Sequence, residues 1–271
     1  MIQHVILFAV GLGTGVFATI IGIGGGLVVV PVLVLFYHLD PLVAVGTSLC
    51  VVVLNALSGS AAYLRRRRVD VPLGLVLAAG TLPGTWLGIE AVQHVKAGPF
   101  RLLFAAFLGV VFIVIVSRRP AADATRAPAP LLPGGAPRRL TDREGTVFTY
   151  GVRWTPAALA SLAVGVFSSF FGVGGGLIHV PILYRGFGIP VHVAAATSLF
   201  ALFFTALAGA AQAAARGGVD WTYVPALGAG VVIGAQLGAG LASRLRASVV
   251  VKILAASLLA AAAELVRRSL A

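Results

Sequence analysis

Long apolar runs, separated by short polar intervals, dominate the chain. Six runs carry no Asp, Glu, Lys or Arg: 43–64, 71–89, 102–117, 156–184, 186–215 and 221–243. A helix needs about 20 predominantly apolar residues to cross the hydrocarbon core of a bilayer. Most of these runs reach or approach that length, so the pattern predicts an all-α polytopic membrane protein.

The apolar runs form two similar sets. Each set begins with a long, glycine-interrupted unit, at 2–36 and at 156–184. Three transmembrane helices follow in each set, predicted at 43–64, 71–91 and 100–117, and at 191–214, 222–243 and 249–267. Residues 118–155 are rich in Pro, Gly, Arg and Ala without apolar periodicity, which predicts a flexible connection. We therefore expect a first transmembrane module at 1–117, a linker at 118–155 and a second module at 156–271.

A shift of 150 residues aligns the two sets without a gap. Over residues 15–88 it gives 29 identities in 74 positions. Shared apolar composition explains scattered Leu and Val, but not a common register of Gly, Pro, Thr, Ser and Asp. The register indicates a duplication and two tandem homologous modules.

The first unit of each module is too long for one straight span. Residues 2–36 would form a helix of about 52 Å, against a hydrocarbon core of about 30 Å. It must therefore tilt strongly, break or double back, and Gly22–Gly26 is where it can do so, because glycine is unfavourable inside a helix. Non-helical backbone at membrane depth is tolerated only beside protein or a wet cavity. If each unit crosses once the protein has eight spans and parallel repeats; if it crosses twice it has ten and inverted repeats.

Composition and charge strengthen the membrane assignment and set an orientation. The chain is 59% hydrophobic and 10% charged, with a mean hydropathy of +1.02, whereas soluble domains carry about 25% charged residues. The net charge of +12 comes from basic residues between the apolar runs, notably Arg65–Arg68 and the linker. The positive-inside bias places both in the cytoplasm. No basic face with interleaved aromatics suggests a nucleic-acid partner.

The chemistry inside the predicted spans is sparse. No Lys or Arg lies mid-span, and the acids fall in loops or near span ends, with Asp70 and Asp220 expected to cap the third helical unit of each module. The five His show no metal-ligand spacing, and Cys50 is the single cysteine. We therefore expect no metal, cofactor or catalytic residue. The empty midplane disfavours a cation or metal permease, and the missing polar cluster disfavours a membrane enzyme or a non-transport assembly protein.

Backbone and hydroxyl groups remain as candidates for binding. A helix that begins after a glycine triplet presents free N–H groups and a partial positive charge, which suits an anion. Helix packing and hydroxyl back-bonding are the alternative explanation. The candidate substrate-binding residues are Gly24, Gly25, Gly26, Thr47, Ser48, Asn55, Gly174, Gly175, Gly176, His179, Thr197 and Ser198. His179 is equally compatible with a satisfied interior histidine, and the Gly80/84/88 and Gly230/234/238 stripes favour tight helix packing.

The motifs resemble the sulfite exporter TauE/SafE family, also called toluene-sulfonate uptake permeases. G-x-G-G-G-L followed by V-P occurs as Gly22–Leu27 with Val30-Pro31, and as Gly172–Leu177 with Val180-Pro181. A-x-x-T-S-L follows as Ala44–Leu49 and Ala194–Leu199. The resemblance implies a multi-pass transporter of the bacterial inner membrane for sulfur-containing anions such as sulfite, sulfoacetate or thiosulfate. It implies no catalytic residue, and it leaves open the direction of transport and whether the protein is a monomer or a homodimer.

Overall fold

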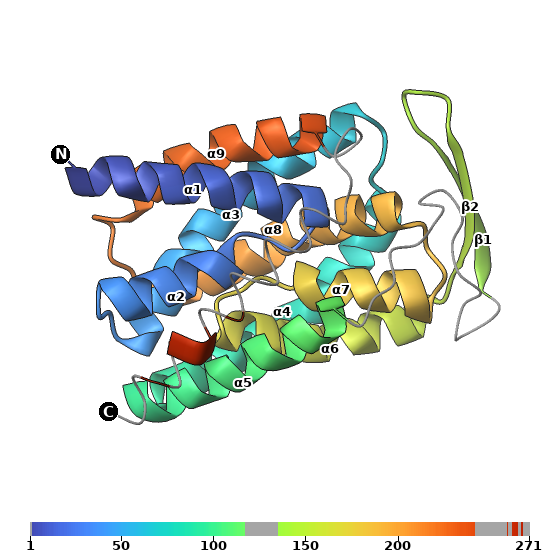
Figure 1. Cartoon of the computed structure of the whole chain (residues 1–271). Helices are drawn as coiled ribbons and strands as arrows, with labels where there is room; N and C mark the ends of the chain where they lie inside the picture. The colour runs from blue at the N-terminus through green and yellow to red at the C-terminus, as the bar shows by residue number, and fades with distance from the viewer. Residues whose placement is uncertain (1, 117–134, 242–258, 260–261, 265–266, 268–271) are drawn as a thin grey trace.

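The structure is a computed structural model of the chain that describes residues 2–116, 135–241, 259, 262–264 and 267. The helices are α1 (Ile2–Ile21), α2 (Gly26–Phe36), α3 (Pro41–Arg65), α4 (Val71–Gln93), α5 (Ala97–Val116), α6 (Trp154–Phe170), α7 (Gly176–Pro181), the π-helical turn η1 (Ile182–Gly186), α8 (Val191–Ala215) and α9 (Val224–Leu241). Two strands, β1 (Ala136–Thr141) and β2 (Val147–Val152), lie at one end of the helices (Figure 1). Most of the last predicted span, 249–267, lies outside the described residues.

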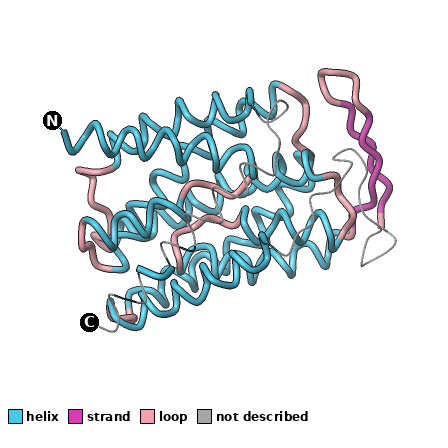
Figure 2. The backbone as a smooth tube through the Cα atoms, viewed as in Figure 1, coloured by secondary structure: helices cyan, strands magenta, loops and turns pink. Residues whose placement is uncertain are grey.

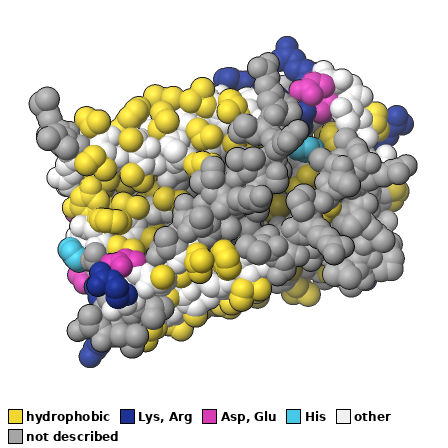
Figure 3. Space-filling view, viewed as in Figure 1, with side chains coloured by type: hydrophobic (Ala, Val, Ile, Leu, Met, Phe, Trp, Pro, Cys, Tyr) yellow, Lys and Arg dark blue, Asp and Glu magenta, His cyan; other side chains and the backbone are white. Residues whose placement is uncertain are grey.

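Five described helices are long and apolar enough to cross a membrane: α1, α3, α4, α8 and α9. Shorter apolar helices accompany them at Gly26–Phe36, Ala97–Val110 and Trp154–Phe170. All run roughly side by side (Figure 2). On the described part of the visible face hydrophobic side chains cover the sides of the helices, while Lys, Arg, Asp and Glu gather toward the ends (Figure 3). The chain is therefore an α-helical multi-pass membrane protein, as predicted.

The centre of the helical bundle is formed by α3 and α8. About two thirds of α3 and nearly three quarters of α8 are buried inside the protein, against one third of α1. Around them α1 packs along α9, and α4 packs along α6. Each outer pair therefore joins one helix from before the linker to one from after it.

The glycine stripes make these outer pairs close. A Cβ on Gly80, Gly84 or Gly88 would overlap the backbone of α6, and a Cβ on Gly230, Gly234 or Gly238 would overlap that of α1. The packing interpretation of both stripes is confirmed. The contacts advance together along both partners, from Phe8 to Val16 as α9 runs from Gly230 to Gly238. The helices of each pair therefore run in the same direction.

The predicted breaks in the first units are confirmed. Between α1 and α2 the chain passes through Gly22 (φ +77°) and Gly24 (φ +81°), and after α6 through Gly172 (φ +64°) and Gly174 (φ +82°). Backbone in this left-handed region strongly favours glycine, so side-chain-bearing residues would strain these turns. The chain after Ile21 doubles back, and α2 runs against the direction of α1 (Figure 1).

The expectation of a wholly flexible linker is wrong for residues 136–152. Here β1 and β2 form an antiparallel hairpin that pairs Ala136 with Val152 and Thr141 with Val147. Phe148, Tyr150 and Val152 point inward and are buried. The alternation of apolar and polar residues along 147–152 is a strand pattern of period two. A prediction based on helical periodicity and on Pro and Gly content overlooks it.

Candidate substrate site at the crossing of two broken helices

The two helix breaks, 22–26 and 172–176, lie against each other in opposite directions. A Cβ on Gly26 would overlap the carbonyl oxygen of Gly172, and a Cβ on Gly176 would overlap that of Gly22. Midway between these contacts, Gly24 and Gly174 both face the side chain of Leu202. Segments 22–26 and 172–176 therefore cross in the interior of the protein, and Gly24 and Gly174 lie at the centre of the crossing.

Helix ends of opposite polarity meet at this crossing. The N–H groups of Gly26 and Leu27 open α2 and have no acceptor within the helix. Gly26 lies against Gly172, just after the carboxyl end of α6, and Gly176 lies against Gly22, just after the end of α1. Each partially positive helix start therefore faces a partially negative helix end. In this conformation the two polarities offset each other.

The serines of the two T-S-L motifs are both buried, and Ser48 contacts the crossing. Ser48 Oγ donates to the carbonyl oxygen of Gly172 at 2.9 Å. Ser198 is also fully buried, and its Oγ has no hydrogen-bond partner among the described residues. A buried hydroxyl without a partner is costly and makes Ser198 a candidate contact for a solute.

The threonines of the same motifs bind loops instead. The backbone N–H of Asp220 donates to Thr47 Oγ1 at 2.9 Å, and that of Asp70 donates to Thr197 Oγ1 at 3.0 Å. Asp70 caps α4 by accepting from the N–H of Leu73, as predicted. The expectation for Asp220 is wrong, because α9 begins only at Val224 and Asp220 Oδ1 accepts from the N–H of Thr222 in the preceding turn.

A small cavity borders the first break. It holds about 20 Å³ and is lined by Thr14, Phe17, Ala18, Ile21, Ile23, Gly24, Gly25, Leu27 and Val28. The hydroxyl of Thr14 has no described partner. One water needs roughly 10–15 Å³ of such volume and two or more polar contacts. The cavity is therefore water-sized, and it keeps Gly24 and Gly25 from being wholly enclosed by side chains.

Two further candidate residues, Asn55 and His179, are buried on α3 and α7. Asn55 on α3 is fully buried; its Oδ1 accepts from Thr19 Oγ1 at 3.4 Å and its Nδ2 is unpartnered in the described structure. His179 on α7 is 1% exposed, and its Nε2 lies 3.0 Å from Ser161 Oγ. Ser161 Oγ itself donates to a backbone carbonyl, and Nδ1 of His179 lies near Gly175 and has no hydrogen-bond partner among the described residues.

Several buried hydroxyls went unnoticed in the sequence. Thr81 Oγ1 and Thr205 Oγ1 are 2.6 Å apart and link α4 to α8. Ser168 and Ser169, at the end of α6, have no described partners. These residues are not repeated as identities 150 positions away, so the shared register of Gly, Thr and Ser could not select them.

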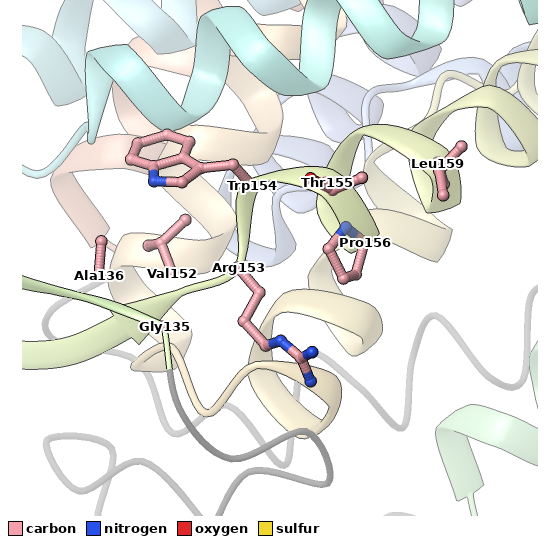
Figure 4. A pocket seen from close by; sticks show the side chains of 8 residues that line it. All are labelled: Gly135, Ala136, Val152, Arg153, Trp154, Thr155, Pro156 and Leu159. Atoms are coloured by element: carbon pink, nitrogen blue, oxygen red, sulfur yellow. The ribbon is translucent and has the colours of Figure 1, made fainter.

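A larger hollow lies at the base of the hairpin, away from the glycine segments. It measures about 500 Å³ and is lined by Gly135, Ala136, Val152, Arg153, Trp154, Thr155, Pro156 and Leu159 (Figure 4). It is broadly open and contains none of the predicted substrate-binding residues. Across the described chain, no three His, Cys, Asp or Glu side chains come together as a metal site would require.

Broken helices that cross inside an apolar helical bundle are a feature of membrane transporters. Residues 7–265 match the family model described as sulfite exporter TauE/SafE. The chain therefore belongs to this family of membrane transporters, which are not enzymes.

Several relatives share most of their length with the chain. The probable membrane transporter protein YunE of Bacillus subtilis is 31% identical over 259 residues, covering 93% of each chain. The probable membrane transporter protein YdhB of the same organism is 24% identical, covering 88% of this chain and 89% of its own. The sulfite exporter TauE/SafE family protein 6 of Arabidopsis thaliana is 36% identical over 73 residues, 27% of this chain and 17% of its own. No solved structure matches the chain.

Proposed function

We propose that the protein is a secondary transporter that moves small anions, most simply sulfur-containing oxyanions or sulfonates such as sulfite, sulfoacetate or thiosulfate, across the bacterial inner membrane. The observation that carries the proposal is the crossing of the two glycine breaks inside a charge-free apolar core. Backbone amides and the buried hydroxyl of Ser48 lie at this crossing beside the carbonyl groups of Gly22 and Gly172, and amide and hydroxyl donors of this kind bind anions.

The carboxylates at the ends of the membrane helices favour an anion over a cation or metal ion as the substrate. Asp70 is engaged by Arg138, and Glu90 is engaged by Arg216. A desolvated cation needs oxygen ligands, and these two groups are already neutralised at the ends of helices.

The packing favours two inverted modules, at 1–117 and 156–271. Under the 150-residue shift α1 corresponds to α6 and α4 corresponds to α9, so the pair α1–α9 corresponds to the pair α6–α4. The two crossing segments also run antiparallel. Because α2 doubles back after α1, the first unit counts as two segments. This corresponds to the alternative with ten spans, in which the second module is inverted relative to the first.

The described conformation is a closed state in this proposal. The cavity at the first break has room for about one water, too little for a sulfonate. Separating the two crossing segments would uncover the amides at Gly25 and Gly175 and remove the opposing helix ends. The amides would then be free to receive an anion at the centre of the protein.

Arginines set the orientation that we propose. Arg68, Arg138 and Arg143 gather at the end of the bundle that carries the hairpin. The positive-inside bias assigns this end, with the Arg65–Arg68 loop and the linker, to the cytoplasm.

The test of the glycine site substitutes glycines whose backbone conformation is compatible with a side chain. Gly25 and Gly175 have φ of −55° and −65°, and a Cβ would meet only side-chain atoms, at 2.7 Å and 3.0 Å respectively. We expect Gly25→Ala and Gly175→Ala to lower anion flux in proteoliposomes about tenfold, the effect of some 1.4 kcal/mol. Gly13→Ala is the matched control, because its Cβ would meet nothing within 4 Å.

Sulfite, thiosulfate and sulfoacetate are tested separately, each against chloride and a monovalent cation. Wild-type flux in both glycine variants, with the proteins folded, would reject the glycine site. Flux of cations without any response to anions would favour a cation permease instead.

A further inference from the structure

Two matching contacts hold the central helices together at opposite ends of the bundle. At the hairpin end, the N–H of Asp70 before α4 donates to Thr197 near the start of α8. At the other end, the N–H of Asp220 before α9 donates to Thr47 near the start of α3. Each contact joins the loop before one helix to another helix of the opposite half.

Only the contact at Asp70 is reinforced by the hairpin within the described chain. Arg138 on β1 donates to both carboxylate oxygens of Asp70, at 2.6 Å and 3.2 Å. Tyr150 on β2 donates to Oδ2 at 2.8 Å. The Asp70 side chain is 1% exposed, so these bonds form away from water. By contrast, the Asp220 side chain accepts a hydrogen bond from within its own turn, from the N–H of Thr222.

A second tie fixes the tip of the hairpin to the loop between α3 and α4. Arg68 Nε donates to Asp142 at 3.2 Å, and its Nη2 donates to Glu144 at 3.0 Å. The backbone N–H of Arg143 donates to the carbonyl oxygen of Arg66 at 3.0 Å. The hairpin is therefore held at both ends by charged groups of one short loop.

The inner face of the hairpin closes over the helices. Phe148, Tyr150 and Val152 belong to an apolar cluster that also contains residues of α4, of η1 and the turn after it, and of α8: Leu73, Leu77, Ala78, Leu183, Phe187, Ile189, Val193, Ala194 and Ala201. The hairpin thus covers the place where α4, η1 and α8 meet, and separating these helices requires it to move.

We propose that the β1–β2 hairpin is a gate at this end of the transporter, latched by Arg138 and Tyr150 to Asp70. The inference rests on the transport function proposed above. The hairpin must move away from Asp70 before the hydrogen bond from the Asp70 N–H to Thr197 can break. Only then can α4 and α8 separate. In the described part of the chain the opposite end has the Asp–Thr contact without such a latch, so we expect the two ends to open with different ease.

The groups of the latch are suited to reversible release. Hydrogen bonding to Asp70 raises the pKa of Arg138, so the guanidinium stays charged. Burial, followed by the bond to Asp70, raises the pKa of Tyr150, so its hydroxyl stays a donor. Arg138 is one third exposed and can exchange Asp70 for water when the hairpin moves.

The experiment measures access beneath the hairpin and flux in the same protein. Cys50 is replaced by Ala, and Val193→Cys places a thiol in the covered cluster. Arg138→Gln removes the charged part of the latch, and Tyr150→Phe removes its hydroxyl while keeping the ring. Arg139→Gln is the matched control, because the neighbouring side chain is exposed on the other face of β1. A membrane-impermeant maleimide reports access to position 193.

We expect Arg138→Gln to raise both the labelling rate at position 193 and solute exchange about tenfold, with a smaller rise for Tyr150→Phe and none for Arg139→Gln. Equal labelling in Arg138→Gln and Arg139→Gln would overturn the gate. So would faster labelling with unchanged flux in both latch variants. An inactive wild-type protein would instead refute the transport function itself, and melting temperatures identify any variant that fails to fold.

Discussion

Adding one methyl group at the crossing of the two breaks is predicted to destabilise the protein. In Gly26→Ala the new Cβ would lie 2.7 Å from Cα of Val173, and it would overlap the carbonyl oxygen of Gly172. Real Cβ contacts are essentially never under 3.0 Å, and both obstacles are backbone atoms, so the two segments must move apart. Overpacking of this kind costs about 1–3 kcal/mol.

The displaced carbonyl adds a second cost. Gly172 accepts the hydrogen bond from Ser48, and losing it costs about 0.5–1.5 kcal/mol. Together the effects predict a loss of about 2–4 kcal/mol for Gly26→Ala. In Gly176→Ala the new Cβ would overlap the carbonyl oxygen of Gly22 and approach Cα of Ile23, so the overpacking cost of about 1–3 kcal/mol applies there without the contribution of Ser48.

The assay is unfolding of the purified protein in detergent, with Gly13→Ala as the control. Gly13 lies inside α1 with open space around its Cβ, so alanine should be neutral or stabilise by up to about 1 kcal/mol. Gly26→Ala and Gly176→Ala should therefore melt well below both the wild type and the control. If all three variants melt together, the crossing segments are not in the backbone contact described.

Two further predictions concern α3 and the orientation. Ser58 donates to the carbonyl oxygen of Val232 and accepts from Gln236, so Ser58→Ala should lower the unfolding free energy by about 1 kcal/mol, the usual range for interhelical bonds in membranes. Ser60→Ala, on the same helix but without a described partner, should not, and equal losses would contradict the assignment. In a protein without Cys50, cysteine at Glu144 should react with impermeant maleimide only from the cytoplasm and cysteine at Trp221 only from the other side; labelling from the same side would reject the topology.

The membrane part of the fold was predictable because its determinants are local. Apolar runs between charges define the helices, and the glycines of Gly22–Gly26 each disfavour a helix by about 1 kcal/mol. The tight packing of Gly80, Gly84 and Gly88 also follows from their spacing on one face. Which helix each stripe contacts does not, because that depends on how distant segments meet in three dimensions.

The limits of the sequence are clearest at the candidate site. The shift of 150 residues selects groups present twice, and so it finds Thr197 and Ser198 but not Ser161 or Thr205. The shift also selects Thr197 as a substrate-binding residue, whereas Thr197 Oγ1 accepts a hydrogen bond from the backbone N–H of Asp70. The docking of the hairpin on the helices could not be predicted either, because Arg138 and Asp70 are 68 residues apart in the sequence.

The pairing of α1 with α9 has a consequence for biogenesis. The first helix emerges from the ribosome long before its partner, so Gly11 and Gly15 face lipid or other early helices until α9 is inserted. Neither half can bury its small-residue surface alone. Assembly in the membrane is therefore concentrated near the end of synthesis, and a chain interrupted in the linker would leave two unpaired halves that need each other to become stable.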